Sequence, residues 1–297
     1  MFLPTSRIPS RSVGTSGILR TFLLAFALVV AGLPVVEAAD VPAQFIEGLR
    51  LPLQRSGSKW IEGMLLADRA TVSNRCITAE GNITVYMMTQ DGLTNRVALA
   101  DRVIMTNDCV TTEGNLTVYM IADTGQTNRI AKADHAVLTN GCVTADGNLT
   151  VYLVSEEGFT NGIATADHVW ATTNNVITAA GNLNFYMIAK NGLTNEIVKA
   201  DTCRMTDDET VTAYGDLIIY MISNEGKVTG VANAEKGIFN MKEMSGFCEG
   251  PVSLEKDGNS LRGRNMRWNS NSNVFKIDSN AVLVIENRDK QTPRRPK

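Results

Sequence analysis

The sequence predicts an all-β protein, built from repeats, in which a bent antiparallel sheet folds over its own core. First, a block of about 33 residues is repeated five times, which indicates one structural unit stacked on itself. Second, each block alternates apolar and polar residues with a period of two, as half-buried strands do. Third, no apolar pattern recurs with the period of a helix, and the runs are rich in β-branched residues. Three columns of identical residues mark the repeat: glycine (Gly81, Gly114, Gly147, Gly181, Gly215), tyrosine (Tyr86, Tyr119, Tyr152, Tyr186, Tyr220) and aspartate (Asp68, Asp101, Asp134, Asp167, Asp201, with Glu235 as a sixth member).

The first 38 residues resemble a cleavable signal peptide. Three arginines precede a twelve-residue apolar run from Phe22 to Leu33, and small residues follow near Ala38. The apolar run is shorter than the roughly 20 residues that a membrane-spanning helix needs. We therefore expect export to the periplasm, with an uncleaved inner-membrane anchor as the alternative.

The rest of the chain divides into three parts. Residues 39–59 are a lead-in segment, residues 60–286 form the repeat domain, and residues 287–297 form a basic tail. The tail combines prolines and charges with few apolar residues, a composition typical of disorder. Without residues 1–38, which hold three Arg and one Glu, 25 basic and 30 acidic side chains are left. Such a balance argues against nucleic acid as a partner.

The first run of each repeat predicts a strand that bends at its glycine. In residues 77–87, Ile77, Ala79, Gly81, Ile83 and Val85 share one face. A glycine that interrupts a strand pattern usually marks a bend or a bulge. In the neighbouring run, Ala98 and Ala100 alternate before Asp101, whereas Val103 and Met105 alternate after it. Such a one-residue change of phase is what a bulge produces, and we expect the aspartate column to stabilise the bend.

Turn residues separate the runs and predict a meander of hairpins. One end of the unit carries turns such as Asn107-Asp108 and Asn140-Gly141, and the other end carries turns such as Asp91-Gly92. A parallel β-solenoid is the alternative architecture. The cysteine spacing distinguishes the two, since equivalent residues in a meander lie roughly 9.5 Å apart. That separation is too large for a disulfide between Cys76 and Cys109, whereas a parallel coil would permit one.

The motifs do not predict an enzyme, a bound cofactor or a metal site. The carboxylates recur by duplication, and the sequence has no Ser/His/Asp set, P-loop or dinucleotide-binding glycine motif. The five cysteines include no Cys-x-x-Cys pair. A repeated, extended surface or groove is the place where function is expected.

These repeats resemble a known family. The phrase Ile-Thr-Ala-Glu-Gly-Asn-Ile-Thr-Val-Tyr (77–86), followed by Ala-Asp-Arg-Val-Ile-Met-Thr (100–106), is similar to the OstA-type repeat of the lipopolysaccharide-export proteins, the LptA and LptC class. Residues 249–268, followed by Val274 to Ile285, are the closest match, and the resemblance covers roughly residues 60–286. It implies a bent jellyroll, or β-taco, whose interior holds the acyl chains of lipopolysaccharide. It also implies edge-strand pairing with other proteins of this type, and the regular repeats would allow end-to-end association of copies of this chain.

The inward apolar residues suggest where a lipid would lie. A slot between two facing halves of the sheet would hold acyl chains without specific polar contacts, since each buried CH₂ contributes about 0.8 kcal/mol. The predicted lipid-binding residues are Ile83, Val85, Leu116, Val118, Leu149, Val151, Leu183, Phe185, Leu217 and Ile219. The function predicted is a periplasmic bridge that carries lipopolysaccharide or a related glycolipid to the outer membrane. The alternative is an exported structural or adhesive rod, in which the same residues form a closed core and the copies associate end to end without lipid.

Overall fold

The computed structural model describes residues 43–53, 60–73, 76–89, 91–106, 109–139, 142–173, 176–206, 210–240, 245–256, 258–269 and 274–285. The predicted signal peptide at 1–38 and the predicted tail at 287–297 lie outside these residues. Within the described ranges, no helix is present that could cross a lipid bilayer. The same ranges are almost entirely β-strand.

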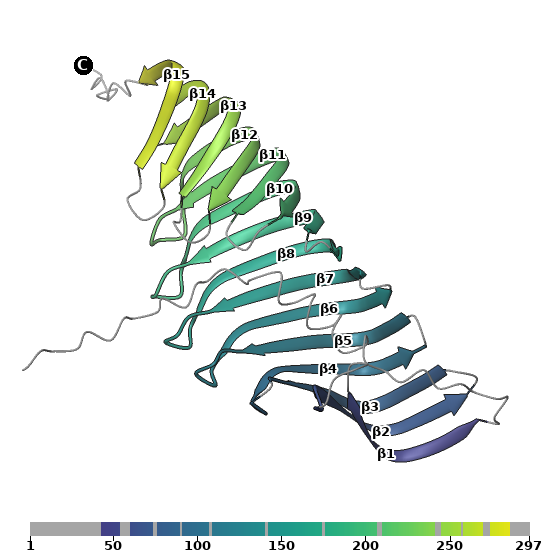
Figure 1. The fold of residues 1–297 in the computed structure, drawn as a ribbon. Coiled ribbons are helices and arrows are strands. Elements are labelled where there is room, and N and C mark those ends of the chain that lie inside the picture. Colours follow the sequence, from purple (N-terminus) through teal and green to yellow (C-terminus); the bar gives the residue numbers. More distant parts are fainter. Residues whose placement is uncertain are drawn as a thin grey trace, which may run out of the picture.

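Fifteen strands form one open sheet in which each strand pairs with its neighbours in sequence (Figure 1). Every pairing is antiparallel, so the predicted all-β, repeat-built antiparallel sheet is confirmed and the parallel solenoid is wrong. The strands are β1 (Gln44–Leu53), β2 (Gly63–Ser73), β3 (Cys76–Met88), β4 (Thr94–Met105), β5 (Cys109–Ile121), β6 (Thr127–Thr139), β7 (Cys142–Val154), β8 (Thr160–Ala171), β9 (Ile177–Ile188), β10 (Thr194–Met205), β11 (Thr210–Ile222), β12 (Val228–Asn240), β13 (Ser245–Lys256), β14 (Asn259–Asn269) and β15 (Val274–Ile285).

The sheet begins within the segment predicted as a lead-in. β1 pairs with β2 over most of its length, from Gln44 opposite Val72 to Leu53 opposite Gly63. The sequence of β1 lacks the Gly-Asn pair of the repeats, but Gly48 has a positive φ of 64° at the corresponding middle of the strand. β1 and β15 are the two edges of the sheet.

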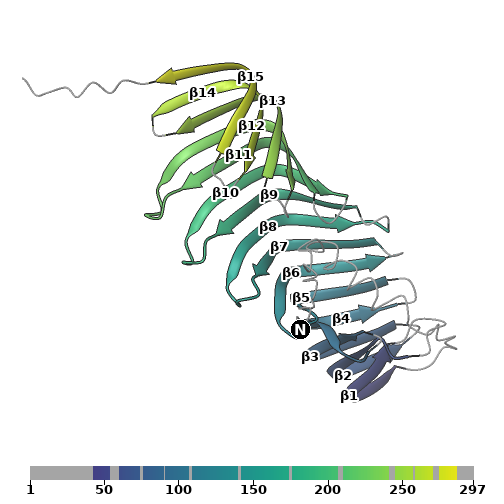
Figure 2. The same ribbon diagram turned by 60° about the vertical axis from the view of Figure 1, so that its left-hand side comes forward.

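Each strand bends in its middle, and the bends align along the sheet (Figure 2). Between β3 and β4, Gly81 and Asn82 together lie opposite the single residue Asp101, because the register shifts there. The same shift recurs at Gly114-Asn115 opposite Asp134. Two residues opposite one is the geometry of a β-bulge, as predicted from the change of phase. Hydrogen bonding continues on both sides of this fold line, so the two halves belong to one sheet.

The aspartate column stabilises the fold line through a repeated contact. Asn115 Nδ2 donates a hydrogen bond to Asp101 Oδ2 at 2.8 Å, and the equivalent pairs Asn82–Asp68, Asn148–Asp134 and Asn182–Asp167 measure 2.7, 2.7 and 2.8 Å. The glycine and the asparagine both have positive φ, for example 72° at Gly114 and 45° at Asn115. Asp101 also covers Gly114, since a Cβ at that glycine would lie 3.1 Å from the Asp101 Cβ. Glycine is therefore required by both its backbone and its neighbour.

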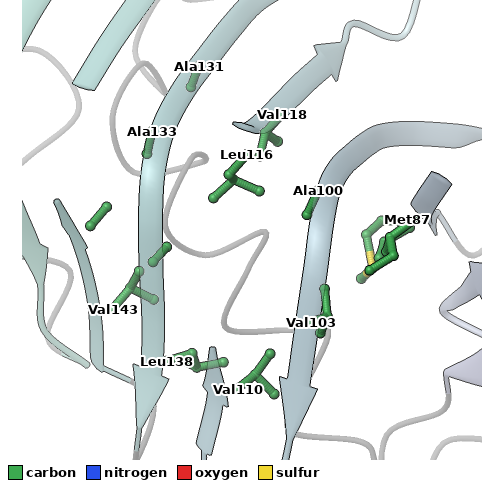
Figure 3. Packing of buried hydrophobic residues seen from close by; sticks show 14 of the residues in the cluster. Met87, Ala100, Val103, Val110, Leu116, Val118, Ala131, Ala133, Leu138 and Val143 are labelled. Atoms are coloured by element: carbon green, nitrogen blue, oxygen red, sulfur yellow. The ribbon is translucent and has the colours of Figure 1, made fainter. Parts of the chain in front are cut away.

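The apolar face of the bent sheet encloses the core. We call the half that holds Cys76, Cys109 and Cys142 the cysteine arm, and the half that holds the tyrosine column the tyrosine arm. In β3, Ala79 lies on the cysteine arm and Ile83 on the tyrosine arm, and both are buried. Figure 3 shows Leu116 and Val118 of the tyrosine arm together with Val110 and Leu138 of the cysteine arm around the same interior. Only a sheet folded on itself can bury one face in this way.

The predicted hairpins and cysteine spacing agree with the meander. At Asp91-Gly92 the N–H of Gly92 donates to the carbonyl of Thr89 at 2.9 Å, and Gly92 has a φ of 76°. The turns predicted at the other end, at residues 107–108 and 140–141, lie outside the described residues. Cys76, Cys109 and Cys142 begin β3, β5 and β7, which are alternate strands, and all five cysteines are free thiols.

Candidate functional site

The space between the two arms is a narrow apolar slot that is nearly filled in the first half of the molecule. Around β2–β5 a cavity of about 30 Å³ remains, with Ile83, Val85, Leu116 and Val118 on the tyrosine arm and Val103 among the residues opposite. Leu116 and Val118 are each 2% exposed. A cavity of this volume holds about one water-sized group, so the slot is closed here.

A larger cavity of about 140 Å³ lies further along the same slot, between strands β7 and β14. Both arms contribute to its wall. From the tyrosine arm come Val151, Leu153, Ala164, Leu183, Asn184, Phe185, Met187, Val198, Ala200 and Leu217, and from the cysteine arm come Cys203, Met205, Val211, Ala213, Gly237, Phe239 and Trp268. We call this space the β9–β12 cavity, after the strands at its centre.

The β9–β12 cavity lies where the core is divided. One cluster of buried residues extends from β1 to Met205 on β10, and a second extends from Leu217 on β11 to Trp268 on β14. Figure 1 shows the strand direction turning steeply over the same region, from β8 to β13. Both clusters contribute to the cavity wall, so the cavity joins two parts of one slot.

Where the two core clusters meet, bulky aromatic side chains lie beside glycine and alanine. The β9–β12 cavity is the volume that these side chains leave unfilled. Phe185 stands where the earlier repeats have Val85, Val118 and Val151. Gly237 stands in a column that otherwise holds Ala70, Val103, Ala136, Val169 and Cys203. A Cβ at Gly237 would lie 2.5 Å from Leu217 Cδ2, so Leu217 occupies the space that this glycine leaves. The rings of Phe239 and Trp268 stack with centroids 6.1 Å apart. Bulky rings beside glycine and alanine leave gaps that the uniform repeats do not.

The cavity wall carries no charged side chain, and it includes the Cys203 thiol. Asn184 also borders the cavity, but it occupies the same column as Thr150 on the outer face, and its amide donates to Thr165 Oγ1 at 3.2 Å. Burial raises the pKa of the Cys203 thiol to about 11, so the thiol is neutral at physiological pH. Nearby in the second core cluster, burial raises the pKa of Cys248 to about 12. The small cavity differs, since Arg96 lies in its wall and burial lowers the pKa of that guanidinium.

The ten residues predicted as lipid-binding all lie on the inner face, but they divide between the two cavities. Ile83, Val85, Leu116 and Val118 line the small cavity. Val151, Leu183, Phe185 and Leu217 line the β9–β12 cavity, where Leu183 and Phe185 are partly exposed. Leu149 and Ile219 are buried in the core and line neither.

The ten residues predicted as lipid-binding all lie on the tyrosine arm, and none of them comes from the wall that the cysteine arm provides. Cys203, Phe239 and Trp268 belong to this wall, together with Val211 and Ala213. The change of phase at the aspartate column indicates that residues two and four positions after the aspartate point inward. This signal identifies Cys203 and Met205 after Asp201 as residues of the wall.

Two other surfaces bear on function. The edge strand β15 exposes consecutive apolar side chains, and Val282, Leu283 and Val284 are 53–60% exposed. The outer face of the sheet is polar and carries ion pairs such as Arg102 with Glu113 at 2.7 Å. Among the described residues, no group of three or more His, Cys, Asp or Glu side chains is arranged to hold a metal ion.

The comparison with known proteins adds no relative. The sequence matches no protein-family model, and no curated protein matches it.

Proposed function

We propose that this protein binds the acyl chains of lipopolysaccharide, or of a related glycolipid, between the arms of its folded sheet and carries the lipid across the periplasm. The observation that carries this proposal is the apolar β9–β12 cavity, which lies in a slot continuous with the rest of the core. The resemblance of the repeats to the OstA-type proteins of lipopolysaccharide export supports the same class of ligand. The proposal involves no catalysis and no cofactor.

The size of the cavity limits what it can hold without further movement. A dry apolar cavity of about 150 Å³ in another protein binds a benzene-sized molecule. The β9–β12 cavity, at about 140 Å³, therefore accepts roughly six carbon atoms. At about 0.8 kcal/mol per buried CH₂, such a segment gains about 4 to 5 kcal/mol. A complete acyl chain requires the arms to separate further along the slot, with lipid replacing contacts between the arms.

The open shape of the sheet is compatible with this movement. The two arms are joined at the fold line, and β1 and β15, the two edges of the sheet, do not pair with each other. Separation of the arms therefore breaks side-chain contacts between them but leaves the hydrogen bonds between neighbouring strands in place. The positive φ angles at the glycine and asparagine of each bend define the hinge.

The exposed edge of β15 favours pairing with a partner protein at this end of the sheet. An edge strand offers unpaired backbone groups to a strand of another protein, and soluble proteins normally protect such edges with charge or proline. Residues 281–284 of β15 carry neither, and their apolar side chains are exposed. We propose that this edge pairs with a related β-jellyroll protein, or with another copy of this chain, so that the apolar slots become continuous. Export by a cleaved signal peptide would place these complexes in the periplasm.

Site-specific photocrosslinking in the native envelope tests the proposal. A benzophenone amino acid replaces Phe185 in the cavity wall, and the matched control carries it at Thr150 on the outer face. We expect lipopolysaccharide, identified by mass spectrometry of the adduct, at residue 185 and not at residue 150. A correctly folded protein without glycolipid adduct at residue 185 would contradict lipid transport.

A structural rod is the second candidate, and the closed slot around β2–β5 favours it. The cavity there holds only about 30 Å³, and the polar outer face and apolar edge suit end-to-end assembly. Both functions use edge pairing, so oligomerisation does not distinguish them. Protein purified from the envelope as oligomers free of lipid would select the rod.

A further inference from the structure

Two arginines lie on the inner face of the tyrosine arm, at the rim of the slot. In β4, Arg96 pairs directly with Met87 of β3 and with Met120 of β5, which are buried inner residues. Arg129 of β6 pairs with Met120 from the other side. Residues directly opposite each other in an antiparallel sheet share a face, so both arginines belong to the inner face. We call this row the rim, because it is the inner row closest to the hairpins at the free end of the tyrosine arm.

Arg96 is a partly buried cation without an anion. Its side chain lines the small cavity around β2–β5, and every other residue of that wall is uncharged. Among the described residues, no ion pair or hydrogen bond joins its side chain to a neighbour, and burial is the one cause that lowers its pKa. A desolvated charge without a counterion destabilises the protein that contains it.

The guanidinium of Arg96 can still be reached from solvent. The wall of the small cavity is apolar, so the stem of Arg96 lines it and the charged head lies beyond it, at the rim. The residue is partly exposed, and its guanidinium nitrogens are not among the fully buried polar atoms. An anion at the rim therefore has access to this unpaired charge.

Arg129 places a second cation beside Arg96. One strand separates the two arginines, so their Cα atoms lie roughly 9.6 Å apart. Side chains of this length can meet on one oxyanion above Met120, and each planar guanidinium offers two parallel N–H donors to it. Arg129 has another interaction within the protein, so Arg96 is the cation that lacks an anion. Two converging cations favour a phosphate monoester, with a charge of about −1.5 to −2 at neutral pH, over a carboxylate.

The charge of the rim changes further along the sheet. The positions equivalent to Arg96 and Arg129 hold Gly162 in β8, Glu196 in β10 and Gly230 in β12. Glu196 lies six strands from Arg96, roughly 29 Å away. An anion at the rim is therefore favoured beside β4–β6 and disfavoured beside β10.

We propose that Arg96 and Arg129 bind the phosphate group of an acylated lipid at the rim of β4–β6, with the acyl chain directed into the slot. This inference rests on the proposed function, because it names the headgroup chemistry of the lipid: a phosphate, and neither a neutral sugar nor a carboxylate. Charge-assisted hydrogen bonds to the phosphate replace the hydration that burial removes from the guanidinium. Because the slot is nearly filled beside β4, the chain enters there as the arms separate.

Decyl phosphate and decyl maltoside test this assignment, because they share an alkyl chain and differ in the charge of the headgroup. The ratio of the decyl maltoside Kd to the decyl phosphate Kd is measured in the mature protein and in Arg96→Gln. We expect this ratio to fall by about 5- to 20-fold in the variant, since charge-assisted hydrogen bonds are lost at a partly exposed site. Arg204→Gln, which removes a cation from the exposed outer face of β10, is the matched control and should keep the wild-type ratio.

The outcomes separate this inference from the proposed function. Arg96→Gln breaks no ion pair among the described residues, so the variant should fold. An unchanged ratio in this variant, with both probes bound, would refute the phosphate site and leave lipid binding intact. Inorganic phosphate alone is the third probe, and a Kd as low as that of decyl phosphate would assign the site to free phosphate and overturn the headgroup assignment. Failure of both decyl probes to bind the wild type would refute both proposals.

Discussion

The strands β3–β8 and the strands β9–β14 derive from the same repeat, but they fill the slot between the arms differently. In β3–β8 the inner positions hold mainly Val, Leu, Ile, Ala and Met in similar order, with Arg96 and Gly162 among the exceptions, and the cavity beside β2–β5 measures about 30 Å³. In β9–β14 phenylalanine, tryptophan and glycine enter the same columns, and the cavity measures about 140 Å³. The columns at the fold line persist in both regions up to Gly215. The bend therefore constrains the sequence more strictly than the packing of the slot does.

The bend in the regular region provides the largest expected effect. Gly147 has a φ of 75°, and a Cβ there would lie 2.6 Å from Asp134 Oδ2 and 3.0 Å from its Cβ. We expect Gly147→Ala to lower the free energy of unfolding by about 3 kcal/mol, because it adds a steric clash to an unfavourable backbone conformation. The control is Gly158→Ala in a hairpin turn, where φ is 84° but nothing lies within 4 Å. Its expected cost is about 1 kcal/mol. Urea denaturation measures both, and equal losses would argue against the contact with Asp134.

A matched pair of alanines tests the difference in packing directly. Ala145 in the closed region is fully buried, and Ala213, its equivalent in the last repeat, lines the β9–β12 cavity. We expect Ala145→Leu to destabilise the protein by about 2 kcal/mol, since a filled core does not accept three more carbon atoms. Ala213→Leu should change stability by less than about 1 kcal/mol and should weaken binding of apolar probes. Similar losses of stability in both variants would show that the two regions are equally filled.

Alkaline pH should destabilise the second region through its two buried thiols. Burial raises the pKa of Cys203 to about 11 and that of Cys248 to about 12, from an ordinary value of 9.0. Above pH 9 the unfolded chain loses these protons while the native protein keeps them, so stability falls as the pH rises toward 11 and 12. Between pH 7.5 and pH 9.5 we expect the wild type to lose about 1 to 2 kcal/mol more than the double variant Cys203→Ala/Cys248→Ala.

Urea denaturation at both pH values measures how far the free energy of unfolding falls in the wild type and in the double variant. Cys142→Ala, which removes an exposed thiol, is the control and should keep the wild-type decline. If the double variant declines as steeply as the wild type, the two thiols are not buried in solution.

The smallest effect concerns the repeat in which aspartate replaces the asparagine of the bend. Asp216 occupies the asparagine position with a φ of 36°, and its carboxylate cannot donate to Asp201 as the amides do in the other repeats. We expect Asp216→Asn to stabilise the protein by about 0.5 to 1 kcal/mol, by restoring the hydrogen bond and removing a pair of like charges. Asn148→Asp should destabilise it by a similar amount. Thermal unfolding of the two variants checks the signs, and shifts in the same direction would contradict the role of the amide.

The regular features of the fold could be predicted from the sequence because the pattern that indicates each of them recurs in several repeats. A one-residue error of register at Ile83 would turn the whole apolar set outward, and five repeats in agreement exclude such an error. The bulge opposite Asp101 followed from the change of phase within a single strand. By contrast, β1 has no copy of the Gly-Asn motif, so nothing in the repeat pattern assigned residues 44–53 to the sheet.

The cavity could be predicted only in part. The period-two pattern identified Leu183 and Phe185 as inward-facing, but the volume between them and Phe239 or Trp268 depends on the positions of several strands and on the twist of the sheet. Phe185 and Gly237, each of which differs from every earlier residue in its column, were local signs that the packing changes there.

Because the strands pair without interruption from β1 to β15, the number of repeats sets the length of the sheet. Neighbouring strands lie about 4.8 Å apart, so fifteen strands span roughly 67 Å and each two-stranded repeat adds about 9.6 Å. Because every repeat contacts mainly its immediate neighbours, duplication of one unit would lengthen the molecule without disturbing the others. Duplication is thus a simple route by which the length of such a molecule could change in steps of one repeat.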